Sequence, residues 1–316
     1  MRVAFAGTPE FALPALAALA ARHEIVGVLT QPDRPQGRGR QLGASAVKAA
    51  ALARRLPLVQ PATLKSAQGR EALILWAPEV LVVVAYGLIL PPAALGIARH
   101  GSLNIHASLL PRWRGAAPIQ RALLAGDAST GVTIMRMNEG LDTGPMLLRR
   151  EVPIAAAATA GSLHDELAAL GATLIVEALD ALERGTLVAE PQPGEGVTYA
   201  AKVDKAEAPI DWDEDARAIG RKVRAFSPWP VAETVFSGQQ LRIHAAYPLP
   251  DQDANAPPSE VKSIENGTIF AVQDNYFAVR CGRGSLAVTE VQLPGRRNTA
   301  ARDFSHSHAL LGQRLG

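Results

Sequence analysis

The fold class can be argued from Val80-Leu-Val-Val-Val-Ala85, a run that is apolar at every position. Such a strand is typical of the centre of a parallel sheet, where helices cover both faces. Outward from this run, the chain alternates between short apolar runs and alanine-rich stretches of helical composition. The further strand candidates are 2–6, 25–29 and 56–59, and the helix candidates are 10–22, 44–55 and 65–76. This alternation predicts an α/β domain with a mostly parallel sheet.

The alternating pattern continues through the first half of the chain and then stops. Strands are expected at 101–106 and 131–137, and a long helix at 162–184 that Gly185 ends. The next stretch is rich in proline and glycine and lacks an apolar period. We therefore expect a first domain over 1–190, a linker over 191–208 and a second domain over 209–316.

The second domain has a different character. A short helix is expected over 213–226, capped by Asp213 and ended by Ser227-Pro-Trp-Pro230. Several short β-like runs with turns between them follow, which predicts a small barrel or sandwich. These runs lie at about 233–236, 241–246, 267–271, 276–280 and 286–292. The tail after Arg297 receives no role, and its His306 and His308 are expected at the surface.

Composition excludes several classes of protein. The chain is 48% hydrophobic and 20% charged, as in ordinary globular proteins, and its formal net charge is only +2. A single cysteine, Cys281, excludes an intramolecular disulfide and fits a reducing compartment. No apolar run reaches the roughly 18 residues that span a bilayer. The first 21 residues superficially resemble a secretory signal, but Pro9 and Glu10 interrupt them, so we expect a strand, a turn and a helix there.

Common nucleotide-binding motifs are missing. Gly7-Thr-Pro9 follows the first strand but supplies one glycine of the G-x-G-x-x-G pattern, and the run from Gly37 to Leu42 lacks the third glycine. The chain also lacks the G-x-x-x-x-G-K-[ST] pattern. NAD and nucleoside triphosphate binding are therefore not expected.

A polar pair stands out on the strand expected at 101–106. Asn104 and His106 are two residues apart, so their side chains point to the same side of a strand. Asp142 follows another strand in a glycine-flanked loop. Together the three could orient an amine and stabilise an oxyanion. Alternatively, Asn104 and His106 could be core residues satisfied by backbone groups. A metal site is not expected, because Asn is a poor ligand for zinc or iron.

A basic segment follows the second strand. Gln31-Pro-Asp-Arg-Pro-Gln-Gly-Arg-Gly-Arg40 holds Arg34, Arg38 and Arg40, with Asp33 as its acid. Such a segment is either a solvated surface loop or an arm that grips a polyanion through its phosphates. Its position at the carboxyl end of a strand, where α/β sheets build ligand sites, favours the second interpretation.

Over essentially its whole length, the chain resembles the methionyl-tRNA formyltransferase family, within the wider group of folate-dependent formyltransferases. The motifs that carry the resemblance are Phe5–Phe11, Gln31–Pro35 with Gly37–Arg40, Ala85–Pro91, Asn104–Gln120, Gly140–Gly144, Tyr199–Lys202 and Arg224–Pro230. Asn104, His106 and Asp142 alone would indicate only the wider group. The arginine segment and the second domain narrow it to the tRNA enzymes.

The resemblance implies a Rossmann-like first domain that binds 10-formyltetrahydrofolate and an OB-like β-barrel that helps hold initiator tRNA. The formyl group passes to the α-amine of tRNA-bound methionine. It implies catalysis by Asn104, His106 and Asp142, and tRNA contacts by Arg34, Arg38 and Arg40. The implied folate contacts are Ser108, Leu109, Leu110, Pro111, Tyr86, Gly87, Leu88, Ile89 and Leu90. It further implies a cytoplasmic monomer without a metal.

Other functions compete with this one. A glycinamide-nucleotide formyltransferase is usually one domain near 200 residues, so the length opposes it. An amino-sugar nucleotide formyltransferase shares the two-domain plan but has no need of the arginine segment. A non-catalytic RNA-binding protein on an α/β scaffold has no need of Asn104, His106 and Asp142. Formylation assays with charged initiator tRNA and with an amino-sugar nucleotide distinguish these alternatives.

Overall fold

The computed structural model describes residues 1–36, 41–250 and 264–316. Contacts between residues divide the chain into two compact units. The first unit comprises Met1–Pro118, Ser129–Pro153 and His164–Ala200, and the second comprises Ile119–Ala128, Ile154–Leu163 and Ala201–Gly316. The last division falls inside the expected linker, while the boundaries 1–190, 191–208 and 209–316 stay a prediction.

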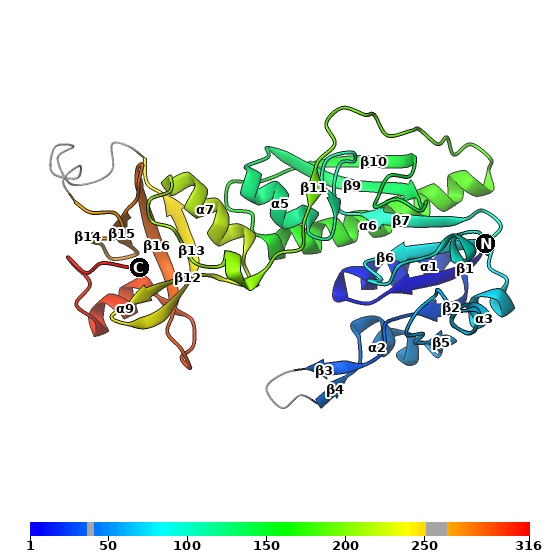
Figure 1. Ribbon diagram of the computed structural model, residues 1–316, viewed down its shortest axis with the longest axis horizontal. Helices are drawn as coiled ribbons and strands as arrows, with labels where there is room; N and C mark the ends of the chain where they lie inside the picture. The colour runs from blue at the N-terminus through cyan, green and yellow to red at the C-terminus, as the bar shows by residue number, and fades with distance from the viewer. Residues whose placement is uncertain (37–40, 251–263) are drawn as a thin grey trace. The chain divides into compact units, whose positions relative to one another are not determined.

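The first unit is built on a seven-stranded sheet with the order β10-β9-β7-β6-β1-β2-β5 (Figure 1). Its strands are β1 (Arg2–Gly7), β2 (Glu24–Leu29), β5 (Leu58–Val59), β6 (Val80–Val84), β7 (Ser102–His106), β9 (Ser129–Arg136) and β10 (Met146–Pro153). The five strands from β7 to β5 run parallel, and β9 is antiparallel to both of its neighbours. The mostly parallel sheet is confirmed, with the fully buried β6 at its centre.

The sequence did not predict β10. This strand lies at the edge of the sheet, and Arg149, Arg150 and Glu151 on it are exposed. A strand at the edge of a sheet has residues exposed to solvent and needs no continuous apolar run, so its composition resembles that of a loop.

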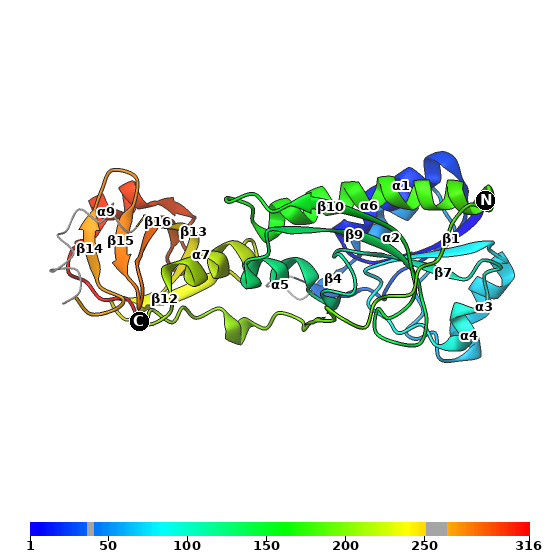
Figure 2. The ribbon, with the colours of Figure 1, turned by 90° about the horizontal axis from the view of Figure 1, so that it is seen from above.

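Helices cover both faces of this sheet. They are α1 (Leu13–Arg22), preceded by the 3₁₀ helix η1 (Glu10–Ala12), α2 (Ala46–Ala53), α3 (Ala67–Trp76), α4 (Pro92–Leu95) and α6 (Ala160–Glu183). Figure 2 shows α1 and α6 on one face and α3 and α4 on the other. On the second face, Leu73 of α3 and Ala94 of α4 belong to one buried cluster with Ala4, Leu81 and Val83 of the sheet.

Two short ribbons complete the first unit. The strands β3 (Arg34–Gln36) and β4 (Gln41–Gly43) pair in antiparallel fashion, so the arginine segment is a hairpin at its ends rather than the plain loop that its composition indicated. Arg38 and Arg40 lie outside the described residues. The strands β8 (Arg114–Gly115) and β11 (Tyr199–Ala200) pair in parallel.

The second unit holds an antiparallel sheet with the order β12-β13-β16-β15-β14, and β17 also pairs with β16. Its strands are β12 (Ala232–Phe236), β13 (Gln239–Pro248), β14 (Ile269–Val272), β15 (Phe277–Arg280), β16 (Ser285–Gln292) and β17 (Thr299–Ala300). Its helices are α5 (Pro118–Ala125), η2 (Lys205–Glu207), α7 (Ala216–Ala225) and α9 (Ala301–Ser307). The antiparallel strands agree with the expected OB-like domain.

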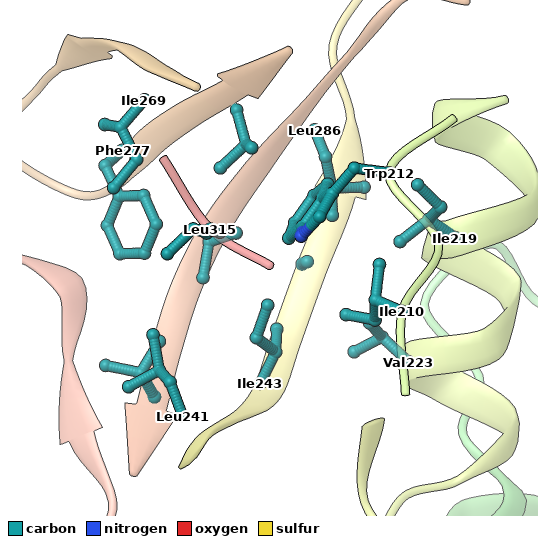
Figure 3. Packing of buried hydrophobic residues seen from close by; sticks show 14 of the residues in the cluster. Ile210, Trp212, Ile219, Val223, Leu241, Ile243, Ile269, Phe277, Leu286 and Leu315 are labelled. Atoms are coloured by element: carbon teal, nitrogen blue, oxygen red, sulfur yellow. The ribbon is translucent and has the colours of Figure 1, made fainter. Parts of the chain in front are cut away.

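Helix α7 packs against this sheet through its apolar side. Figure 3 shows Ile219 and Val223 of α7 pointing toward the strands, with Trp212 beside them. The expectation that Asp213 caps this helix was wrong. Asp215 is the cap and accepts a hydrogen bond from the Arg217 amide, because the helix begins only at Ala216. The Asp213 carboxylate accepts instead from the Asn266 amide at 2.7 Å.

The tail to which the sequence assigned no role connects the two end strands of the antiparallel sheet. Ile269 of β14 donates to the Gln313 carbonyl, and Leu315 donates to the Gly267 carbonyl. On the other side, the Gly316 amide donates to the Val235 carbonyl of β12. The tail therefore hydrogen-bonds to both edges of the sheet and closes it as a barrel. His306 on α9 is exposed, as expected, whereas His308 is half-buried and stacks on the Phe304 ring at 4.3 Å.

We expect Cys281 to resist thiol reagents in the native protein. The residue is fully buried, and burial raises the pKa of its thiol to about 12. Because the thiolate is the reactive form, labelling by an aromatic disulfide at pH 8 is expected to be at least about 10²-fold slower in native than in denatured protein. Equal labelling rates would show that the thiol is accessible.

Among the described residues, no helix is long and apolar enough to cross a membrane.

Candidate active site

Strand β7 presents a polar pair near its carboxyl end. Asn104 and His106 project to the same side of the strand, as the spacing of two predicted. Asn104 is half-buried, and the His106 side chain is only 6% exposed. This end of β7 lies beside β6 in the parallel part of the sheet, where α/β proteins build their ligand sites.

Asp142 joins this pair from the loop between β9 and β10. Its Oδ1 accepts a hydrogen bond of 3.5 Å from Asn104 Nδ2, and its Oδ2 lies 3.7 Å from His106 Nδ1. The Gly115 amide donates to the same Oδ2 at 2.9 Å. The three residues singled out in the sequence are therefore in one place, with a carboxylate, an amide and an imidazole facing one another.

A backbone carbonyl fixes the proton arrangement of His106. Nε2 of its ring lies 2.9 Å from the Trp113 carbonyl oxygen. Because a carbonyl can only accept, Nε2 carries a proton. A second proton can then reside only on Nδ1, the atom that faces Asp142, and it makes the ring a cation beside the carboxylate. The imidazole is held so that this exchangeable position points into the site.

The segment from Ser108 to Pro111 follows β7, the strand that carries Asn104 and His106. The Ser108 hydroxyl donates to the Arg112 carbonyl at 2.6 Å, and the Ser108 carbonyl accepts from Thr133 Oγ1 at 2.7 Å. Leu110 is buried in a cluster with two methionines, whereas Leu109 and Pro111 are half-buried. The side chains of Ser108 and Leu110 are thus engaged inside the protein.

The segment from Tyr86 to Leu90 follows the central strand. Tyr86 and Leu90 are buried, Leu88 is half-buried, and Ile89 is 72% exposed. Burial raises the pKa of the Tyr86 hydroxyl, which has no hydrogen-bond partner among the residues that the structure describes. The Tyr86 side chain is therefore held inside the protein, and its backbone carbonyl accepts a hydrogen bond from Thr8 Oγ1 at 2.8 Å.

A glycine is needed within this segment. Gln31 Nε2 donates to the Tyr86 carbonyl at 2.8 Å. Gly87 has a φ of 78°, and a Cβ there would collide with the Gln31 amide. Only a residue without a side chain allows Gln31 to approach this backbone.

The same hydrogen-bond chain fixes the base of the arginine hairpin. Gln60 Nε2 donates to the Gln31 carbonyl and to Asp33 Oδ1, at 2.9 and 2.8 Å. Lys48 Nζ lies 2.5 Å from Asp33 Oδ2. Hydrogen bonds from Lys48 and Gln60 hold the pKa of the Asp33 carboxyl below its ordinary value, so it is charged at neutral pH. Arg34, which is exposed, directly follows Asp33, and the hydrogen bonds of Gln31 and Asp33 hold this part of the chain next to Tyr86.

Three contributors to the site were not found in the sequence. They are the Trp113 carbonyl, the Gly115 amide and the side chain of Gln192. The first two are backbone groups, which leave no trace in residue type. Gln192 lies in the proline-rich stretch expected to be a linker, where periodicity gives no signal. In the described part of the chain, no group of three or more His, Cys, Asp or Glu residues could hold a metal ion.

Comparison with known families gives a consistent result. Residues 1–179 match the family described as Formyl transferase, and residues 202–309 match the Formyl transferase, C-terminal domain. The chain is 53% identical over 317 residues to the methionyl-tRNA formyltransferase of Methylococcus capsulatus, and the match covers all of both chains. It is 51% identical to the same enzyme of Dechloromonas aromatica, covering 98% of this chain and 97% of that one.

Solved structures share the fold at lower identity. An N-formyltransferase from Helicobacter canadensis, in complex with folinic acid and dTDP-3-aminofucose, superposes with a TM-score of 0.66 at 17% identity, covering 91% of this chain and 98% of that one. HypX from Aquifex aeolicus in complex with tetrahydrofolic acid gives a TM-score of 0.64 at 20% identity. That match covers 96% of this chain, which spans about half the length of the HypX chain.

Proposed function

Because this chain belongs to the formyl transferase family, among the methionyl-tRNA formyltransferases, we propose that it transfers the formyl group of 10-formyltetrahydrofolate to the α-amine of methionyl initiator tRNA. The observation that carries this proposal is the convergence of Asn104, His106 and Asp142. An amide donor and an imidazole beside a carboxylate suit attack by an amine on a formyl carbon.

The reaction balances without a covalent intermediate on the protein. The amine nitrogen bonds to the formyl carbon and loses a proton, while the bond from that carbon to folate N10 breaks and N10 gains a proton. The intermediate stage has a tetrahedral carbon with a negatively charged oxygen. A catalyst for this reaction needs hydrogen-bond donors for that oxygen and an acceptor for the amine proton.

The chain supplies both kinds of group. Asn104 Nδ2 donates toward the site, and His106 donates from Nδ1 when it carries a proton there. Each stabilises the developing oxyanion, which is typically worth about 10²–10³ in rate per donor. Asp142 accepts the amine proton, directly or through water, and its Oδ2 lies 3.7 Å from His106 Nδ1.

The folate fits the surroundings of this trio. Gly87, Leu88 and Ile89 present backbone groups and one exposed apolar side chain beyond the end of the central strand. Such a surface suits a flat ring that needs both hydrogen bonds and apolar contact. The contacts proposed for the folate are these residues, the backbone of Tyr86 and Leu90, and the segment Ser108, Leu109, Leu110 and Pro111.

The arginine hairpin is proposed to hold the acceptor end of the tRNA. Arg34 is exposed, and the hairpin base is tied to the Tyr86 backbone through Gln31 and Gln60. Leu42 on the second strand is 72% exposed, so the hairpin also offers an apolar contact. Phosphates flanking the methionyl ester are natural partners for Arg34, Arg38 and Arg40.

Replacing Arg38 and Arg40 by Ala is expected to raise the KM for charged tRNA at least about 10-fold and to leave the KM for folate unchanged. Each lost phosphate contact flattens the salt dependence by about 0.7 to 0.9 in logarithmic slope. Steady-state kinetics at salt concentrations from about 50 to 200 mM, the range over which phosphate contacts weaken, measure the KM values and the salt slope. Arg54→Ala, an exposed arginine on another part of the same unit, is the matched control. Wild-type kinetics and salt slope in the double variant would refute the contact.

An amino-sugar nucleotide is the second candidate substrate, since the Helicobacter canadensis structure of the same fold holds one. The purified chain is incubated with 10-formyltetrahydrofolate and, in parallel, with methionyl initiator tRNA, uncharged tRNA or an amino-sugar nucleotide. Formylation of the charged tRNA alone is the expected result. Formylation of the sugar nucleotide alone overturns the proposal.

The proposed substrates place the reaction in the cytoplasm, where aminoacyl-tRNA is used. We further propose that a single chain suffices, because Asn104, His106 and Asp142 all come from one copy. Size-exclusion chromatography of the active enzyme tests the second statement.

A further inference from the structure

The stretch from Glu190 to Ala200, which contains the first part of the expected linker 191–208, is hydrogen-bonded to segments beside Asp142. At one end, Glu190 and Met146 exchange two backbone hydrogen bonds of 2.8 Å. At the other end, Tyr199 and Ala200 pair with Arg114 and Gly115. All of these residues belong to the first unit. The stretch is therefore a structural part of the unit that carries the active site.

Gln192 makes the central contacts of this stretch. Its Nε2 donates to the carbonyl oxygens of Asp142 at 2.7 Å and of Gly144 at 2.8 Å. Its Oε1 accepts from Arg114 Nε at 2.9 Å and from Nη2 at 2.6 Å. A guanidinium only donates and a carbonyl only accepts, so Arg114 fixes which end of the Gln192 amide faces Asp142.

Asp142 is a residue that needs such support. Its φ is 52°, in the left-handed region that residues with a side chain seldom adopt. A backbone of this kind persists only where its surroundings hold it. Gln192 holds the backbone on one side, and the Gly115 amide holds the carboxylate on the other.

Arg114 links these two supports. It is 9% exposed and donates to Gln192, and its neighbour Gly115 donates to the Asp142 carboxylate. Burial of a guanidinium is unfavourable unless its donors are satisfied, so Arg114 and Gln192 depend on each other. Gly115 has a φ of 119°, and a Cβ there would press on the Ala200 carbonyl, which keeps the two segments in close contact.

We infer that Gln192 is a positioning residue for the reaction: it sets the direction of the Asp142 carboxylate toward His106 and the amine. This inference rests on the proposed function, because Asp142 is assigned there as the proton acceptor. Gln192 acts through Asp142 and touches neither the folate nor the tRNA. Loss of its Nε2 donor is expected to lower kcat about 10- to 100-fold, since misplacement of a reacting group by 1 Å costs about 10² in rate.

Two variants separate positioning from simple packing. Gln192→Met keeps the length of the side chain and removes all four hydrogen bonds. Gln192→Glu keeps an acceptor for Arg114 but lacks the donor for the two carbonyls. Both are expected to lose kcat with KM for folate and charged tRNA unchanged. Glu195→Ala, an exposed residue of the same stretch, is the matched control and retains full activity.

A double variant supplies the decisive comparison. If Gln192 acts through Asp142, then Asp142→Asn combined with Gln192→Met is no slower than Asp142→Asn alone. If the kcat loss of the double variant is the product of the losses of the two single variants, Gln192 contributes by another route and the inference is overturned. Wild-type kcat in Gln192→Glu also overturns it. The wild-type enzyme is assayed first on charged initiator tRNA. If it is inactive, the proposed function fails; an active wild type with an unaffected Gln192→Glu refutes the positioning role alone.

Discussion

Asp142→Asn is expected to lower kcat for formylation of methionyl initiator tRNA by at least about 10²-fold. Asn has nearly the same shape and keeps an oxygen that accepts from the Gly115 amide. It cannot accept a proton from the amine, and it removes the negative charge that lies 3.7 Å from His106 Nδ1. Because these effects arise in the transition state, kcat and kcat/KM are expected to fall together. Single-turnover formylation with saturating folate measures the loss directly.

The control for Asp142→Asn is Glu139→Gln. Glu139 is an exposed carboxylate of the same loop, so it tests whether loss of one negative charge near the site is enough to slow the reaction. We expect wild-type kcat from this control. His106→Ala is expected to show a loss similar to that of Asp142→Asn. Full turnover in Asp142→Asn or in His106→Ala would remove these residues from the mechanism.

Leu315→Ala is expected to destabilise the second unit by about 2–5 kcal/mol, the usual range for truncating a buried leucine. Leu315 is 1% exposed and belongs to the main apolar cluster of that unit (Figure 3). Its amide also pairs with the Gly267 carbonyl where the tail closes the sheet. A cavity at this point therefore weakens both the core and the closure.

Leu311→Ala is the matched control, because Leu311 lies four residues earlier in the same tail and is 66% exposed. Its effect is expected to stay within about 0.5 kcal/mol, as for surface substitutions in general. Urea unfolding followed by tryptophan fluorescence measures both variants, since Trp212 lies in the affected core. Equal stabilities of the two variants would show that the tail is not part of the folded unit.

The active site was foreseeable as a set of residue types and only partly as geometry. Asn104 and His106 could be placed on one side of a strand, because side chains alternate along any strand. Asp142 could be named but not oriented, since its left-handed backbone is imposed by groups distant in sequence. The Gly115 amide and the Gln192 side chain reach it from positions 27 and 50 residues away along the chain.

The parallel sheet could be predicted from residue types alone, because a strand buried on both faces must be apolar throughout, as 80–84 is. Residue types also identified the basic segment 31–40 and predicted a small barrel or sandwich of short strands in the second unit. Residue types could not predict the edge strand β10, the cap at Asp215, the closing tail or the hydrogen bonds that hold 190–200. These features depend on partners in space: hydrogen bonds to remote backbone groups follow from how the chain packs and leave no periodic pattern in the residues that make them.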